Sequence, residues 1–150
     1  FSLAIGYEAR SYSSDVDDSS DVEINLEFLT QLTGKSIVIA NVYREVRGSY
    51  TAAGEALDAT GGALTLMHTA SPKLNLSAGF TFENSSYFRT RSGVTLPPDL
   101  NTYTWTASAD YDVTEFFGVF SDISYKINES DDKDRDFEAF TTHVGMKASF

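Results

Sequence analysis

Residues 101–113 read NTYTWTASADYDV and contain the clearest periodic pattern in the chain. Tyr103, Trp105 and Ala107 alternate with threonine residues, and the alternation of apolar and polar residues continues to Tyr111. Successive side chains of a β-strand point to opposite faces of a sheet. A period of two therefore predicts a strand with one apolar and one polar face.

The same alternation recurs along the chain and predicts eight strands. Near the end of the chain, Phe140, Val144, Met146 and Ala148 alternate with polar residues up to Phe150. The pattern gives strands near 1–13, 21–33, 36–50, 62–71, 74–90, 101–113 and 116–130, and a last strand that ends at Phe150. We therefore expect an all-β chain.

The connections between these strands alternate in length. Short turns are expected at 33–35, 71–73 and 113–115, and long connections at 14–20, 51–61, 91–100 and 130–137. In an up-and-down arrangement of antiparallel strands, the short and the long connections lie at opposite ends. Strand-turn-strand units recur at intervals of roughly 40 residues that align Tyr43, Phe82 and Tyr125, which indicates a meander of repeated hairpins.

Short turns at one end and long loops at the other are typical of outer-membrane barrels. We therefore predict a transmembrane antiparallel up-and-down β-barrel of eight strands. Residues 1–150 form a single domain in this interpretation, either a whole barrel or the C-terminal part of a larger one. Phe1 already belongs to a strand pattern, so we expect a mature or trimmed product.

Composition excludes several classes of protein. No apolar segment approaches the roughly 18 residues that a membrane helix needs, whereas a barrel strand needs only about 9–11 residues of alternating character. The absence of cysteine excludes disulfides, thiol chemistry and cysteine metal sites. A net charge of -11 argues against a nucleic-acid partner, which would require clustered lysine and arginine.

The placement of charged and aromatic residues favours a lipid-facing apolar surface over the inward apolar surface of a soluble barrel. Charges deep inside strands need a wet or internally paired lumen. The expected lumen network consists of Glu8, Arg10, Glu27, Asp122, Lys126, His143 and Lys147. Two interfacial aromatic belts are expected, with Phe116, Phe117, Tyr111 and Phe150 toward the short turns and Tyr50, Tyr87, Phe88, Tyr103 and Phe140 toward the long loops.

The third strand has apolar residues on both faces. Ile37 shares a face with Asn41, whereas Val38, Ala40 and Val42 share the other face. Because an asparagine in lipid is costly, we expect the set of three to face outward.

The end of the chain resembles the C-terminal assembly signal of outer-membrane proteins, on the residues Val144, Met146, Ala148 and Phe150. That resemblance implies recognition by the barrel-assembly machinery. The signal often has an aromatic residue where this chain has Ala148. As a whole the chain resembles the small eight-stranded barrels of the outer-membrane protein A transmembrane domain, OmpX and OmpW type. Its hairpin repeats are also similar to β-barrel porins of exopolysaccharide export systems.

Candidate chemical sites are few. His68 and His143 stand in no recognisable catalytic motif, so we expect lumen or interface histidines and no enzymatic activity. Two acidic loop clusters could hold Ca²⁺ or Mg²⁺ weakly, and their members are Asp15, Asp17 and Asp18 and then Asp132, Asp134 and Asp136. An EF-hand is excluded because Phe137 stands where its turn needs glycine. Solvated acidic loops are the simpler interpretation, and no cofactor is expected.

The sequence thus predicts a non-enzymatic barrel in the bacterial outer membrane that serves as a structural anchor or displays surface loops, with a plugged polar interior. Its expected partners are outer-membrane lipids, lipopolysaccharide and the assembly machinery. The alternative is part of a porin or polysaccharide-export barrel with a cation-preferring lumen, and a soluble ligand-carrying barrel is a third possibility.

Overall fold

Eight strands make up almost the whole of the described chain. The computed structural model describes residues 2–10, 19–48, 55–89 and 98–148, and the side chains among them from residue 23 onward except 48, 55, 56, 88 and 89. The strands are β1 (Ser2–Arg10), β2 (Ser19–Thr33), β3 (Ser36–Gly48), β4 (Glu55–Ser71), β5 (Leu74–Arg89), β6 (Leu100–Asp112), β7 (Phe117–Ser130) and β8 (Phe137–Ala148). One 3-10 turn, η1 (Lys133–Arg135), lies between β7 and β8, and none of the described segments is a helix long and apolar enough to cross a membrane.

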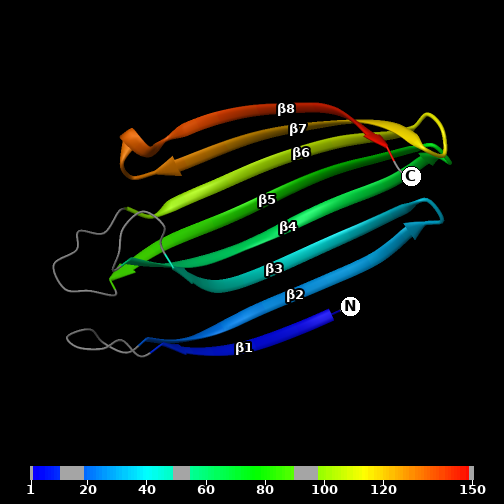
Figure 1. Ribbon diagram of the computed structural model, residues 1–150. Coiled ribbons are helices and arrows are strands. Elements are labelled where there is room, and N and C mark those ends of the chain that lie inside the picture. The colour runs from blue at the N-terminus through cyan, green and yellow to red at the C-terminus, as the bar shows by residue number, and fades with distance from the viewer. Residues whose placement is uncertain (1, 11–18, 49–54, 90–97, 149–150) are drawn as a thin grey trace.

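The strands form one antiparallel sheet in which every strand pairs with its sequence neighbours, in the order β1 to β8. The β2–β3, β4–β5 and β6–β7 turns lie at one end of the sheet, on the right in Figure 1, and the β7–β8 connection, which the structure describes, lies at the other. This confirms the predicted all-β, up-and-down arrangement of eight strands. Within the described residues β1 and β8 are not paired with each other, so the sheet has two free edges.

One strand boundary differs from the prediction. The segment 51–61 was expected to be a loop, but β4 already begins at Glu55 and pairs with both β3 and β5 from there on. Gly61 and Gly62 suggest a break in the strand, because glycine is disfavoured in strand interiors. Pairing with a neighbour on each side satisfies the backbone of β4 here and outweighs that local preference.

The register assigns each residue to one of two faces, because directly opposed residues share a face. Trp105 lies opposite Phe80 on β5 and Tyr125 on β7. We call the face that contains Trp105 the apolar face. Its central residues are Ile24, Leu26, Phe28, Val38, Ala40, Val42, Leu64, Leu66, Leu76, Ala78, Phe80, Phe82, Tyr103, Trp105, Ala107, Ile123, Tyr125, Phe140, Val144 and Met146.

The opposite face, which we call the polar face, carries mainly threonine, serine, asparagine, glycine and charged residues. Its large apolar residues include Leu29, Ile37, Ile39, Met67, Phe120 and Phe137. Val38, Ala40 and Val42 lie on the apolar face, which confirms the face assignment in the third strand. The repeat alignment is wrong in one respect. Tyr43 lies opposite Gly61 on the polar face, whereas Phe82 and Tyr125 lie on the apolar one. The alignment failed because it matched residue types without the strand register, and the register puts even-numbered positions on the apolar face in β3 and β5 but odd-numbered positions in β7.

The polar face is the more crowded of the two. Seven residues with described side chains are buried, and six of them, all except Val46, belong to the polar face: Ala59, Gly61, Ser85, Gly118, Asn128 and Ser130. Side chains on the inside of a curved sheet lie closer together than those on the outside. The sheet therefore curves toward its polar face.

The strands are staggered in a regular way. A line through opposed partners passes from Arg44 to Thr60, Asn84 and Asn101. The line lies at a different distance from the turn of each hairpin. The distance is about 10 residues in the β2–β3 hairpin, about 12 in the β4–β5 hairpin and about 14 in the β6–β7 hairpin. With the turns at one level, the stagger is about one residue per strand, which for a rise of ~3.3 Å and a strand spacing of ~4.8 Å means a tilt of about 35°.

Candidate functional site

The most distinctive feature of the molecule is a broad apolar surface that no other element covers. Sixteen large apolar side chains of the apolar face are exposed, and no side chain of the described residues is both large and fully buried. The most exposed of them belong to the edge strand β8, where Phe140, Val144 and Met146 are 68%, 77% and 74% accessible. A surface this extensive is not expected in a monomer surrounded by water.

An aromatic ladder crosses the part of the apolar face formed by β5 to β7. The ring of Trp105 lies 5.3 Å from that of Phe80 and 5.8 Å from that of Tyr125, and the rings of Phe82 and Tyr103 are 5.2 Å apart. Tyr125 lies opposite Phe140 and donates a hydrogen bond of 2.7 Å to Glu138, so its hydroxyl leaves the apolar region on the loop side. Aromatic side chains with one apolar and one wet end are typical of membrane interfaces.

The expected aromatic belts are partly found. On the apolar face of β6, Tyr103 lies toward the loops and Tyr111 toward the turns, and Phe116 and Phe117 follow at the β6–β7 turn. Tyr87 was predicted to join the loop-side belt, but it pairs with Leu57 on the polar face and has the guanidinium of Arg135 over its ring at 5.5 Å. Distance from a strand end alone did not specify its face. Tyr50, Phe88 and Phe150 lie outside the described side chains.

A polar cluster spans β3 to β5 on the polar face. The Tyr43 hydroxyl donates a hydrogen bond of 2.6 Å to Glu83, and the Arg47 guanidinium forms an ion pair of 3.1 Å with the same carboxylate. Arg47 is also ion-paired with Glu45 on its own strand, and Ser85 donates a hydrogen bond of 3.2 Å to Glu83. The Glu83 carboxylate therefore has three partners.

Gly61 makes this cluster possible. It lies on β4 between Tyr43 and Glu83 and directly opposite both. A Cβ atom added at Gly61 would lie 2.6 Å from the Phe82 carbonyl oxygen and 2.8 Å from the Tyr43 ring and hydroxyl. The Tyr43 ring thus packs over Gly61, where a side chain would otherwise lie, and its hydroxyl reaches Glu83 two strands away. Aromatic residues often cover sheet glycines in this way.

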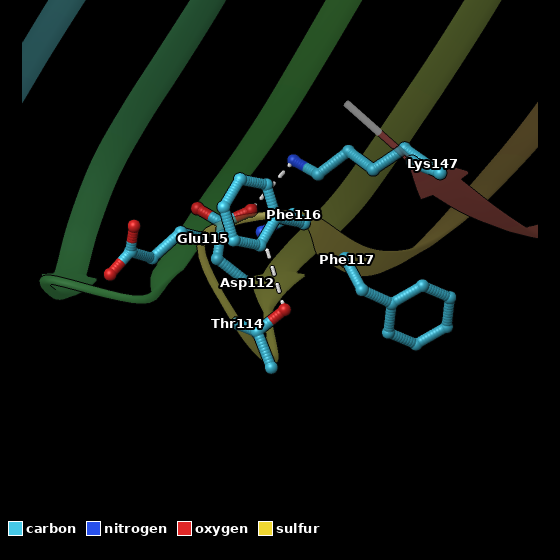
Figure 2. A pocket seen from close by; sticks show the side chains of 8 residues that line it. Asp112, Thr114, Glu115, Phe116, Phe117 and Lys147 are labelled. Atoms are coloured by element: carbon cyan, nitrogen blue, oxygen red, sulfur yellow. Dashed lines mark hydrogen bonds and ion pairs between the residues drawn. The ribbon is translucent and has the colours of Figure 1, made fainter. Parts of the chain in front are cut away.

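A second cluster uses the same principle at the turn end. Lys147 of β8 reaches across Gly118 of β7 and forms ion pairs with Asp110 and Asp112 of β6 at 3.1 Å and 3.0 Å. Figure 2 shows the Lys147–Asp112 pair beside the β6–β7 turn, with the Phe117 ring pointing away from it. In each cluster a long side chain links strands that are not neighbours in the sheet, β3 with β5 and β8 with β6.

An open cavity of about 280 Å³ lies beside the second cluster at the β6–β7 turn. It is lined by Asp112, Thr114, Glu115, Phe116, Phe117, Gly118, Lys147 and Ala148. The backbone N–H of Phe116 donates to the Thr114 hydroxyl at 3.2 Å (Figure 2). The Lys147 ammonium is already paired with two carboxylates, so the cavity has a neutralised cation at its rim rather than a free anion-binding group.

The predicted lumen residues lie on the polar face wherever their side chains are described. Glu27 lies opposite Asn41, and Asp122 lies opposite His143. Lys126 has its ammonium over the Phe137 ring at 5.5 Å. Lys147 forms ion pairs with two aspartates outside the predicted set. Glu8 and Arg10 belong to β1, whose side chains lie outside the described ones.

The β7–β8 connection uses two of its three predicted acids as local caps. The Asp132 carboxylate accepts from the Asp134 backbone N–H at 3.2 Å. The Asp136 carboxylate accepts from the Ser130 N–H at 2.7 Å and from the Lys133 ammonium at 3.0 Å, and these bonds hold the pKa of Asp136 below its ordinary value.

Asp134 is exposed in this connection. Among the described residues no group of three or more acids and histidines is placed to hold a metal ion. The acids of the first cluster, Asp15, Asp17 and Asp18, lie outside the described residues.

The two histidines lie on different faces. Ser36 Oγ and His68 Nδ1 are 2.9 Å apart on the apolar face near the short turns, and Thr33 donates to Ser36 at 3.0 Å. A hydroxyl nucleophile activated by histidine also needs a group that orients the imidazole. Within the described part of the chain, the structure gives no carboxylate hydrogen bond to His68 or to His143. The Ser36–His68 contact links β3 and β4 near the short turns.

The Tyr43–Glu83–Arg47 cluster was not among the sequence-predicted sites. Its members are separated by up to 40 positions and meet only because β3 and β5 flank the same glycine. The available signal was Gly61 inside an alternating segment, since a glycine within a strand often marks a close approach of neighbouring groups.

Comparisons with known proteins give one likeness. No family model matches the sequence, and no curated protein matches it. Among solved structures, the chain is similar to the crystal structure of Ail, the attachment invasion locus protein of Yersinia pestis, with 14% sequence identity and a TM-score of 0.31, over 97% of this chain and 95% of that chain. The fold assignment rests on the strand pairing of this chain itself.

Proposed function

We propose that this chain is a non-enzymatic outer-membrane β-barrel protein that anchors and displays the loops at the long-connection end of its strands. The observation that carries the proposal is the pair of opposed faces. One face exposes sixteen large apolar side chains, whereas the other is mainly polar and holds the ion pairs of Glu83 and Lys147. Lipid is the environment in which the first face is favourable, and a narrow polar interior suits the second.

The dimensions of the apolar face support this environment. Tyr103 and Tyr111 bound it on β6 and are eight residues apart, which is about 27 Å along a strand. At a tilt of about 35° this distance covers about 22 Å of depth, close to the ~25 Å apolar band of outer-membrane barrels. The partners that this function implies are membrane lipids and, at the loop side, lipopolysaccharide. The barrel-assembly machinery is a further partner, because the C-terminal residues resemble its recognition signal.

Part of a wider porin or polysaccharide-export barrel is the second candidate. The observation that favours it is the pair of free edges at β1 and β8, which could pair with further strands. In that case the acidic residues of the polar face would line a wet, cation-preferring lumen.

The test of the proposal is expression with an export signal, followed by membrane fractionation. We expect the protein in the outer-membrane fraction and resistant to extraction by carbonate. It should migrate differently on SDS gels with and without boiling, because a closed barrel keeps its backbone hydrogen bonds in unheated SDS. A protein that stays in the aqueous fraction, with one mobility under both conditions, would contradict the proposal.

A further inference from the structure

The free edges of β1 and β8 raise the question of what covers them. In lipid an unpaired strand edge leaves backbone N–H and C=O groups without hydrogen-bond partners, which is strongly unfavourable. The apolar side chains of β8 are also the most exposed in the molecule. Resting on the membrane function proposed above, we infer that β1 of the same chain covers the edge of β8, in a defined register that places Val144 opposite Ile5.

The direction of the strands permits this closure. β1 runs from the turn end toward the loop end, and β8 runs from the loop end toward the turn end (Figure 1). The two edges are therefore antiparallel to each other, like every other pair in the sheet. An even number of strands in a meander has this property, so closure needs no change in the pairing of the other strands.

The stagger of the hairpins fixes the register. The line through opposed partners moves about one residue away from the turn end at each strand, as the three hairpins show. Over eight strands the displacement is about eight residues, which is the shear of a closed barrel tilted by about 35°. Extended in both directions, the line passes through Ile5 on β1 and reaches position 136, just before β8. On closure, the residue of β8 opposite Ile5 lies eight residues beyond position 136, toward the turn end. This residue is Val144, and the same register places Met146 opposite Leu3.

The two faces agree with this register. Ile5 pairs with Ile24 of β2 and so belongs to the apolar face, and Val144 belongs to the same face through Ser121 of β7. Closure therefore joins apolar to apolar positions and polar to polar positions around the whole ring. A shift by one residue would reverse the faces of one strand relative to the other. The nearest competing register is thus a shift by two residues, which would place Val144 opposite Tyr7.

The glycines of the polar face distinguish these two registers. Each of Gly61, Gly79, Gly118 and Gly145 lies directly opposite a residue whose side chain would contact a Cβ placed there, and these partners are Tyr43, Thr106, Lys147 and Phe120 in the same order. In the proposed register Gly6 lies opposite His143. In the shifted register Gly6 lies opposite Gly145, which would place two glycines side by side. Within the described sheet no glycine lies directly opposite another glycine, so the proposed register agrees better with the described pairing.

Disulfide cross-linking tests the proposal directly, because the chain contains no cysteine. The test variant carries Ile5→Cys and Val144→Cys, and the register control carries Tyr7→Cys and Val144→Cys. The positive control carries Ser121→Cys and Val144→Cys, which are opposite each other in the β7–β8 pair. Each variant is folded into phosphatidylcholine vesicles, oxidised, and analysed for intramolecular cross-links by mass spectrometry.

We expect the test variant to cross-link within one molecule to an extent similar to the positive control and several-fold more than the register control. A second pair on the same register, Leu3→Cys with Met146→Cys, gives the same information if the first pair impairs folding. Stronger cross-linking of the register control would overturn the register. Dimers, or no cross-link while the positive control reacts in the vesicles, would overturn the closure and leave the membrane function intact. Failure of the positive control to enter vesicles would overturn both.

Discussion

Replacing Ala107 by arginine should severely weaken folding into a bilayer. Ala107 lies on the apolar face of β6, opposite Ala78 and Ile123. It is four residues from Tyr103 and four from Tyr111, so it lies midway between the two aromatic ends of the strand. An arginine there would place its guanidinium near the centre of the lipid.

The expected cost follows from this depth. The distance of Ala107 from each aromatic end is about 13 Å along the strand, or about 11 Å of depth at a tilt of about 35°. At the midplane of a barrel, a lipid-facing arginine costs about 2–4 kcal/mol, and the cost falls toward zero near the interfaces. We therefore expect Ala107→Arg to lower the free energy of unfolding by about 2–4 kcal/mol.

Thr106 provides the matched control, because it is the next residue on the same strand and belongs to the polar face. It lies opposite Gly79 and Ser124, two small residues that leave room for a longer side chain. Thr106→Arg should therefore cost less than Ala107→Arg, and the more conservative Thr106→Asn less than about 1 kcal/mol. Urea titrations of the protein in phosphatidylcholine vesicles, followed by tryptophan fluorescence, measure all three. A greater cost at Thr106 than at Ala107 would refute the face assignment.

Three further predictions concern the polar face, the loop and the terminus. Gly61→Ala should lower the free energy of unfolding by about 1–3 kcal/mol, because the new methyl group would overlap the Phe82 carbonyl and displace the tyrosine that covers it. Gly34→Ala, where nothing lies within 4 Å, should have little effect, and equal losses in urea titrations would contradict this. The carboxylate bond of Asp136 should contribute stability to its loop above its ordinary pKa of 3.8 and lose it as the pH falls through the lowered value. An NMR titration of the Ser130 amide with a midpoint at or above 3.8 would disprove this. Deleting Phe150 should reduce outer-membrane levels much more than stability in vesicles, and equal levels of both chains would argue against an assembly signal.

The strand pattern was readable from the sequence because it depends on local alternation. Residues 101–113 predict β6 to within one residue at each end, since apolar and polar residues alternate there without interruption. The same reasoning missed the first half of β4, where Gly61 and Gly62 weaken the local signal. That segment is extended because two neighbouring strands pair with it, and this information is not local.

The polar contacts were only partly readable for a related reason. Alternation identifies which residues share a face, and it placed Lys147 on the polar side, as the register does. It does not identify partners two strands away. Glu83 binds Tyr43 and Arg47, and Lys147 binds two aspartates of β6, because glycines on the intervening strands leave space for long side chains. Such pairs depend on the register, which the hydrophobic pattern fixes only in steps of two residues.

If the apolar face of the sheet lies against lipid, as we propose, the surroundings of the single tryptophan will show it. Trp105 is the one tryptophan of the sequence and lies on the apolar face of β6. In vesicles made from lipids with brominated acyl chains, its fluorescence should be strongly quenched by the lipid and little affected by acrylamide. The control is the double variant Trp105→Phe and Thr104→Trp, which moves the indole to the polar face on the same strand.

Moving the indole to the polar face should remove most of its quenching by brominated lipid. The opposite result would be that brominated lipid quenches Trp105 no more than it quenches the control, while acrylamide quenches Trp105 strongly. That result would show that the apolar face does not contact the membrane.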